Sequence, residues 1–268
     1  MGWRAMLLLG LLAPVGAGAA VPVTGRHQDM TFASYEVNRY AASAYERILA
    51  EQHQAGMLDR NTDQLRRLRG IARRLITQAV KLKYQASLWH WEIHLTSSPD
   101  VDAFCMAGGK LLISSHFIDR YQLTDGELAT VLAHEIGHAL AEHVREQLSE
   151  VQLHNPRYAY PDVADAAADM NSDLGLYLSL MPLSRIQERE ADRIGIRLAF
   201  MAGYPTSAVL SFYRKLAAQE RESGAVSFFR SHSSAERRLQ LATEAVRDER
   251  KQVRLTPTGG QPLRFVLR

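Results

Sequence analysis

Cysteine is almost absent from this chain of 268 residues, because Cys105 is the only one. A single thiol cannot form an internal disulfide, and it cannot supply the paired thiolates that close many structural zinc sites. We expect Cys105 to pack as a small apolar side chain.

An excess of one charge is also missing, since 32 basic and 29 acidic residues leave a formal net charge of +3. Such a mixed surface argues against nucleic acid as the main partner. Hydrophobic residues make up 46% of the chain, which is enough to build the core of one large domain.

Long hydrophobic runs are missing as well, because the best internal candidate, 174–183, is interrupted by Ser179 and Pro182. A bilayer span needs roughly 20 apolar residues. At the N-terminus a basic start and the short apolar run 5–12 precede Ala17-Gly-Ala19, the pattern of a cleavable secretory signal over 1–19. We therefore expect an exported, soluble chain with no transmembrane segment after cleavage.

Apolar residues recur at helical spacing over 31–54 and 62–84, which predicts two amphipathic helices. Alternating apolar and polar residues over 89–96 predict a half-buried strand. A second short strand is expected over 110–114. It is either an exposed edge that pairs with an extended substrate or an ordinary packed strand.

Thr124-Asp-Gly-Glu127 has the form of a capping box and predicts a helix to about residue 147. The segment 153–182 is rich in turn formers and weak in periodicity, which is typical of a long loop, and such loops are often lids. Three further helices are expected: one from Ser184 to before Gly203, one from Pro205 to about 222, and one from the capping box at Ser233 to about 251.

The sequence His134-Glu-Ile-Gly-His138 lies in the middle of the first capped helix. Residues four apart share one helix face, so both imidazoles can reach one metal ion. Catalytic Zn²⁺ takes such nitrogens and keeps one position open for water. Glu135 lies about 100° around the helix and can reach that water without being a ligand.

The third ligand is expected from a later helix. His143 is five residues beyond His138, roughly 140° off the face, and no glycine at 141 would let the helix turn back, so we expect a solvated side chain. Glu188 is the better ligand, and Asp192, four residues on, can accept the far N–H of a ligating histidine. The alternative for both acids is a surface helix with Glu and Arg pairs.

These motifs resemble those of the M48 family of zinc peptidases, in which H-E-x-x-H is followed by a helix with an E-x-x-A-D pattern, here Glu188-Arg-Glu-Ala-Asp192. The likeness covers about half the chain, from roughly 101 to 241, and is greatest to soluble periplasmic members. It implies that His232 and Arg238 lie near the metal and steady the reaction. Two positions depart from the family pattern: Asp102, where Asn is common, and Ser233, where Pro is common.

The resemblance implies an α+β, mainly helical fold: a zincin-like single catalytic domain over 20–252, with a small β-sheet and the H-E-x-x-H helix, followed by a tail over 253–268. The expected function is a zinc-dependent endopeptidase with one Zn²⁺ per subunit, in which Glu135 takes the proton of the attacking water. Its substrates would be unfolded or misassembled envelope proteins, with possible envelope protein partners. The alternatives are a periplasmic chaperone-like binding factor and a structural zinc protein, which the single cysteine disfavours.

Overall fold

The computed structural model describes residues 19–154, 160, 162–172, 174–223 and 235–253. The expected signal, apart from Ala19, lies outside the described residues, as do His232, the cap at Ser233 and the tail beyond Val253. The described part is α+β and mainly helical, as predicted.

The helix that carries the H-E-x-x-H sequence lies at the centre of the molecule. This helix, α4 (Asp125–Leu140), contacts α2, α5, α7, α8 and the edge strand β4, and nearly all of its side chains are buried. Thr124 and Glu127 form the predicted capping box. The helices around it are α1 (Ser34–Gln54), α2 (Thr62–Leu82), α3 (Ser115–Arg120), α5 (His143–His154), α6 (Val163–Ser172), α7 (Leu174–Met201), α8 (Thr206–Ser223) and α9 (Ala235–Val253), with a 3₁₀ turn, η1, over Tyr84–Leu88.

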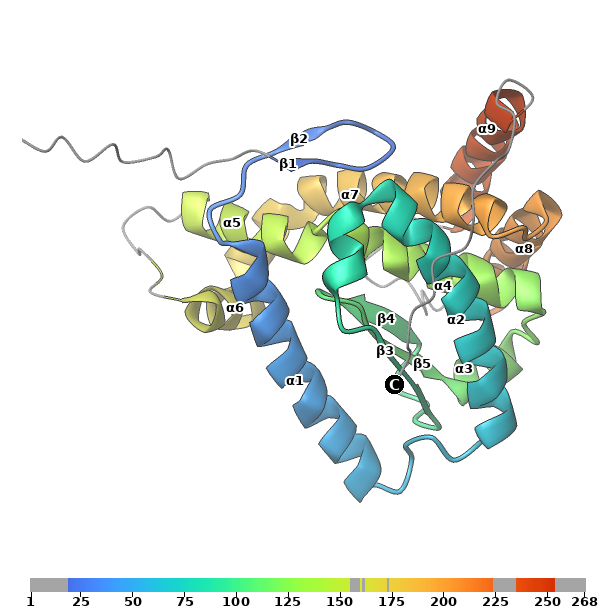
Figure 1. The fold of residues 1–268 in the computed structure, drawn as a ribbon, viewed down its shortest axis with the longest axis horizontal. Coiled ribbons are helices and arrows are strands. Elements are labelled where there is room, and N and C mark those ends of the chain that lie inside the picture. The colour runs from blue at the N-terminus through green and yellow to red at the C-terminus, as the bar shows by residue number, and fades with distance from the viewer. Residues whose placement is uncertain (1–18, 155–159, 161, 173, 224–234, 254–268) are drawn as a thin grey trace, which may run out of the picture.

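A three-stranded sheet lies between α1 and α2 (Figure 1). Its strands are β3 (Glu92–Thr96), β4 (Ala103–Met106) and β5 (Lys110–Ser114), in the order β3-β5-β4. β5 pairs in parallel with β3 and antiparallel with β4, and all five of its residues are buried. The expectation of an exposed edge at 110–114 is therefore wrong, and the packed-strand alternative is confirmed.

The edge next to the central helix is instead β4, which the sequence analysis did not identify as a strand. β4 turns into β5 through Gly108 and Gly109, both at positive φ. A Cβ on Gly109 would lie 2.6 Å from the ring of Trp91, so only glycine fits there. A second, two-stranded hairpin joins β1 (Ala19–Ala20) and β2 (His27–Gln28).

The predicted single helix over 125–147 is broken, because α4 ends at Leu140 and α5 begins at His143. Glu142 turns the chain with φ 53°, a region that residues other than glycine seldom adopt. Its carboxylate is held by Ser34 at 2.5 Å and by Lys83 and Arg145, each at 3.1 Å. Ser34 and Lys83 are distant in the sequence, so no local pattern predicts the turn.

The predicted long loop over 153–182 is also wrong, because α5, α6 and α7 account for most of it. α7 begins at Leu174 rather than near Ser184 and contains Pro182. The part missed by the prediction, before Ser184, contains Pro182 and the exposed Met181, so neither proline content nor apolar spacing there indicates a helix.

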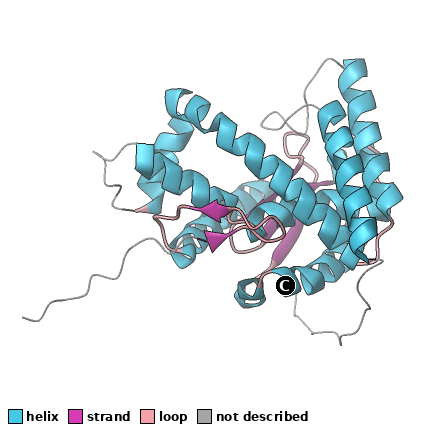
Figure 2. Ribbon diagram, turned by 90° about the horizontal axis from the view of Figure 1, so that it is seen from above, coloured by secondary structure: helices cyan, strands magenta, loops and turns pink. Residues whose placement is uncertain are grey.

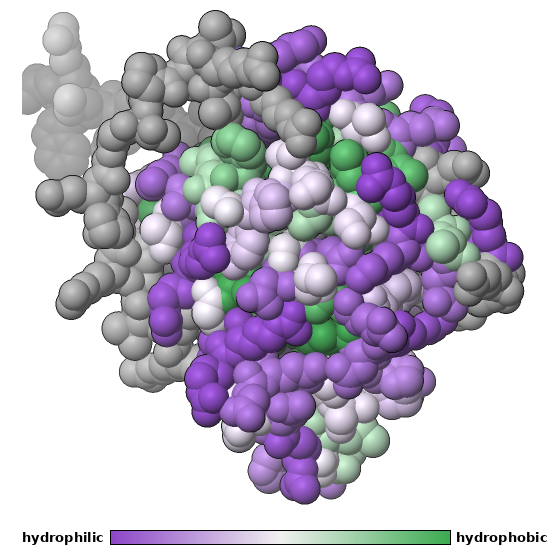
Figure 3. All heavy atoms as spheres, turned by 90° about the vertical axis from the view of Figure 1, so that its right-hand side faces the viewer, coloured by the Kyte–Doolittle hydropathy of each residue, from purple (hydrophilic) through white to green (hydrophobic). Residues whose placement is uncertain are grey.

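Helices make up most of the ribbon in Figure 2. On the face shown in Figure 3, polar side chains predominate and apolar ones form small separate groups. None of the helices in the described part of the chain combines the length and the apolar character that a membrane span requires.

Candidate metal centre

Three predicted ligands meet between α4 and α7. The Nε2 atoms of His134 and His138 lie 3.1 Å apart. On α7, the Glu188 carboxylate lies 3.2 Å from Nε2 of His138 and 3.5 Å from Nε2 of His134. One donor atom from each residue lies within 4.8 Å of the others, so the three side chains converge on one point.

The donor set fits zinc. Zn²⁺ binds imidazole nitrogen and carboxylate oxygen at about 2.0–2.1 Å, so two donors of a tetrahedral site lie about 3.3 Å apart. The three separations in this cluster lie close to that value. Two histidines and a glutamate leave a fourth position for water, as catalytic zinc sites require.

Two glycines bring the ligand-bearing helices together. A Cβ on Gly137 would lie 2.9 Å from the carbonyl oxygen of Ala191, and a Cβ on Gly195 would lie 2.9 Å from the backbone nitrogen of His134. The backbones of α4 and α7 therefore touch at these positions. This approach places Glu188 opposite the two histidines.

Asp192 lies one turn beyond Glu188 and supports His134, with its Oδ1 3.0 Å from Nδ1 of that ring. Tyr213 donates its hydroxyl to Oδ1 of Asp192 at 2.6 Å, and Arg238 donates Nε to Oδ2 at 3.1 Å. Burial would raise the pKa of Asp192, but the charge of Arg238 and the hydrogen bond to His134 hold it well below its usual range. An ionised Asp192 accepts the Nδ1 proton of His134 and leaves Nε2 for a metal.

Arg238 is 1% exposed and lies among these supporting residues. Its Nη1 is 4.0 Å from Glu188, and its Nη2 is 3.1 Å from Nδ1 of His134 and also contacts Asp192. The resemblance implied a place near the metal for Arg238, and its contacts are with two of the three predicted ligands, His134 and Glu188. Its contacts support the ligands through Asp192.

His143 was expected in solvent, and this expectation is wrong: it is 1% exposed. The turn at Glu142 carries α5 back toward α7, which places Nδ1 of His143 2.9 Å from Nδ1 of His138. The sequence analysis excluded His143 as a ligand, and in the described part of the chain it lies outside the ligand cluster. Because the prediction assumed an unbroken helix, it missed this contact.

Glu135 lies on α4 beside the edge strand and is 7% exposed. Burial raises the pKa of Glu135 to about 7, and the nearby backbone N–H of Cys105 in β4 acts in the opposite direction. A cation at the cluster would lower that pKa by charge attraction. A carboxylate in this position suits a general base near neutral pH.

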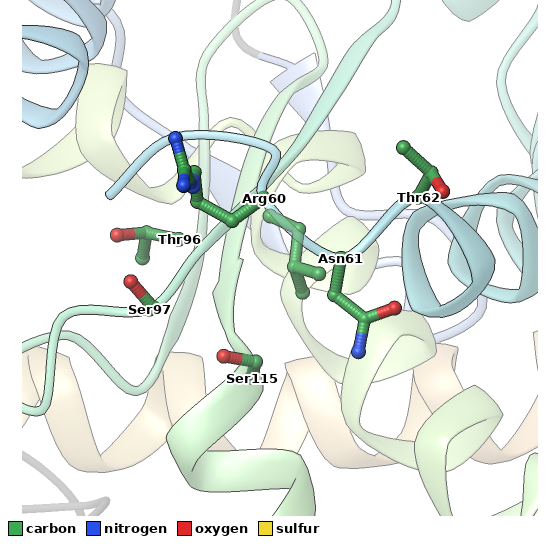
Figure 4. Close-up of a pocket in the computed structure, with 7 residues that line it drawn as sticks. Arg60, Asn61, Thr62, Thr96, Ser97 and Ser115 are labelled. Carbon is green, nitrogen blue, oxygen red and sulfur yellow. The ribbon is translucent and has the colours of Figure 1, made fainter. Parts of the chain in front are cut away.

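A separate cavity of about 390 Å³ lies where β3 ends and where α2 and α3 begin (Figure 4). It contains none of the ligand residues. Six polar residues and one leucine line it: Arg60, Asn61, Thr62, Leu95, Thr96, Ser97 and Ser115.

Comparison with known proteins gives consistent matches. The family model described as peptidase family M48 matches residues 63–246. The mitochondrial metalloendopeptidase OMA1 of Arabidopsis thaliana is 32% identical over 161 residues, 58% of this chain and 31% of that protein. OMA1 of Schizosaccharomyces pombe is 27% identical over 229 residues, 84% of this chain and 65% of that protein.

A beta-barrel assembly-enhancing protease from Yersinia pestis is also similar, at 30% identity over 143 residues, 49% of this chain and 29% of that protein. The aligned part of this chain thus corresponds to between about a third and two thirds of the length of these relatives. All three matches lie in enzymes whose names describe proteolysis.

Proposed function

The chain belongs to peptidase family M48, and from that premise we propose that it is a zinc-dependent endopeptidase. His134, His138 and Glu188 hold one ion, and Glu135 is the general base. The observation that carries the proposal is the convergence of two imidazole nitrogens and one carboxylate at separations of 3.1, 3.2 and 3.5 Å.

The residues around the cluster divide the chemistry between them. A zinc ion held there would lower the pKa of its water to about 7 and polarise the scissile carbonyl. Glu135 takes the proton of that water and passes it to the leaving amine. Asp192 and Arg238 keep the ring of His134 oriented, and His232 remains a proposed contributor near the reacting carbonyl.

An extended substrate would lie along β4. The backbone N–H of Cys105 lies near Glu135, so the edge of β4 that does not pair with β5 faces the cluster. Backbone groups alternate along a strand, and Ala103 therefore turns its N–H and C=O to the same side. Pairing at this edge would bind the substrate mainly through hydrogen bonds to its backbone, with a smaller contribution from its side chains.

The substrates we infer are unfolded or misassembled proteins of the bacterial envelope. The signal pattern over 1–19 supports export to the periplasm. The likeness to a protease named for enhancing β-barrel assembly supports an envelope role. Cleavage after Ala19 would leave a mature chain that begins at Ala20, which N-terminal sequencing of the exported protein would test.

The test of the enzyme is a matched pair, the purified chain and Glu135→Gln. We expect one zinc per chain in both, by elemental analysis, and cleavage of unfolded casein only by the wild type. A chelator should stop cleavage and added zinc should restore it. Zinc-free, inactive wild-type protein would refute the proposal, and casein binding without cleavage would favour a chaperone-like binding factor.

A further inference from the structure

The second histidine ligand is supported by another histidine. Nε2 of His138 faces the ligand cluster, while its Nδ1 lies 2.9 Å from Nδ1 of His143. A neutral imidazole carries one proton, so His138 bound to a metal through Nε2 carries its proton on Nδ1. Nδ1 of His143 must then accept it, which puts the proton of His143 on Nε2.

The next partner is a carboxylate from α7. Nε2 of His143 lies 3.2 Å from Oε2 of Glu190, so both ring nitrogens of this buried histidine are used. Hydrogen bonding to a carboxylate fixes the tautomer that the previous step requires. A histidine that only filled space in the core would need neither contact.

Glu190 is in turn held by the segment before α1. Arg26 donates Nε and Nη2 to the two oxygens of Glu190, each at 2.8 Å, and Thr24 donates its hydroxyl at 3.1 Å. The same guanidinium binds Glu146 of α5 at 2.5 and 2.8 Å. Figure 1 shows the β1–β2 hairpin, from which these residues come, lying against α5 and α7.

We propose that Arg26, Glu190 and His143 form a relay of positioning residues that fixes the tautomer and ring orientation of His138 for metal binding. The N-terminal hairpin is then part of the metal centre, although it contributes no ligand. This inference rests on the ligand set of the proposed function. It is independent of the support that Asp192 gives to His134.

The first test measures zinc affinity by competition with a chromophoric chelator. His143→Phe fills a similar volume but offers His138 no acceptor, so zinc should bind about 10–100-fold more weakly, as when outer-shell partners are lost. His143→Gln keeps one acceptor and one donor and should recover most of that loss. A folded His143→Phe protein with wild-type zinc affinity would overturn the relay.

The second test compares Arg26→Gln with Arg197→Gln. The latter is the control, because it removes an arginine–glutamate ion pair of similar exposure elsewhere in the fold. Arg197 binds both oxygens of Glu249 at 3.2 Å and is 33% exposed, against 28% for Arg26. We expect weaker zinc binding and an altered spectrum of the Co²⁺-substituted protein in Arg26→Gln only. If the two variants changed zinc affinity and the Co²⁺ spectrum equally, Arg26 would contribute only to general stability, and the proposal would be overturned.

Glu188→Ala separates failure of the relay from failure of the proposed function. Wild-type protein that binds zinc no better than Glu188→Ala would refute the ligand set itself. Wild-type binding that requires Glu188, together with unchanged binding in His143→Phe and Arg26→Gln, would overturn the relay alone.

Discussion

Two buried carboxylates near the cluster have opposite surroundings. The charge of Arg238 holds the pKa of Asp192 low in spite of burial, whereas burial raises the pKa of Glu135 to about 7. Environments that separate the pKa values of neighbouring acids commonly mark different roles. Asp192 is therefore suited to remain ionised as a support, and Glu135 to exchange a proton.

Glu135→Gln tests the second role directly. The amide keeps the shape of the side chain but cannot take a proton, so we expect kcat to fall by at least about 10²-fold, the lower end for loss of a general base. Zinc content and the midpoint of thermal unfolding should match the wild type. Substantial turnover by pure Glu135→Gln would remove Glu135 from the mechanism.

Asp192→Asn tests the first role. The change leaves the buried charge of Arg238 without its main partner, so the free energy of unfolding should fall by about 3–5 kcal/mol, and zinc should bind about 10–100-fold more weakly. Urea unfolding of the metal-free protein and chelator competition measure the two effects.

Asp125→Asn is the matched control, because its exposed carboxylate pairs with Arg67 at the surface. In Asp125→Asn the free energy of unfolding should fall by less than about 1 kcal/mol, and zinc affinity should not change. Similar losses in the two variants would contradict a special role for Asp192.

At the scale of elements, the crossing of α4 and α7 determines the geometry of the site. Gly137 and Gly195 allow backbone contact, and the three ligands converge because the helices approach so closely. Larger residues at the crossing would separate the histidines from Glu188. The geometry of the predicted ligand set thus depends on glycine, which has no side chain, at these two positions.

Gly195→Ala should destabilise the protein by about 1–3 kcal/mol and weaken zinc binding, because its Cβ would lie 2.9 Å from a backbone atom of α4. Gly70→Ala in α2 is the control, since a Cβ there meets nothing within 4 Å. It should stabilise the protein by about 0.5–1 kcal/mol through helix propensity. Chemical unfolding measures both, and a gain in stability for Gly195→Ala would show that the helices can separate freely.

Local patterns predicted the elements whose causes are local. The capping box at Thr124 begins α4, and the strand expected over 110–114 has those bounds. Helical spacing also predicted that His134 and His138 share one face of α4, and in the fold that face is turned toward Glu188. These successes rest on residues separated by only a few positions in the sequence.

Features with distant causes could not be predicted. The turn at Glu142 is held by Ser34 and Lys83, and from the sequence alone the chain there continues a helix. The error on His143 followed from that turn. The prediction began α7 near Ser184 instead of Leu174, because Pro182 is usually a helix breaker and the exposed Met181 interrupts the apolar spacing.

At the scale of the molecule, a metal bound between α4 and α7 links two helices from different parts of the chain. Binding to the folded state alone adds about 2.7 kcal/mol to stability when free zinc is 100-fold above its dissociation constant. We expect a chelator to lower the thermal midpoint of the wild type but not that of Glu188→Ala. Calorimetry with and without chelator measures the shift, and equal shifts would place the stabilising metal elsewhere.

The supports of the two histidines come from opposite ends of the described chain, Arg26 before α1 and Arg238 in α9. During synthesis the ribosome makes the H-E-x-x-H helix well before α9, so the motif exists for a time without its support. Domains generally fold as units once their chain is available. A nascent chain that ends before α9 therefore carries the H-E-x-x-H sequence without the contact by which Arg238 holds Asp192 and, through it, His134.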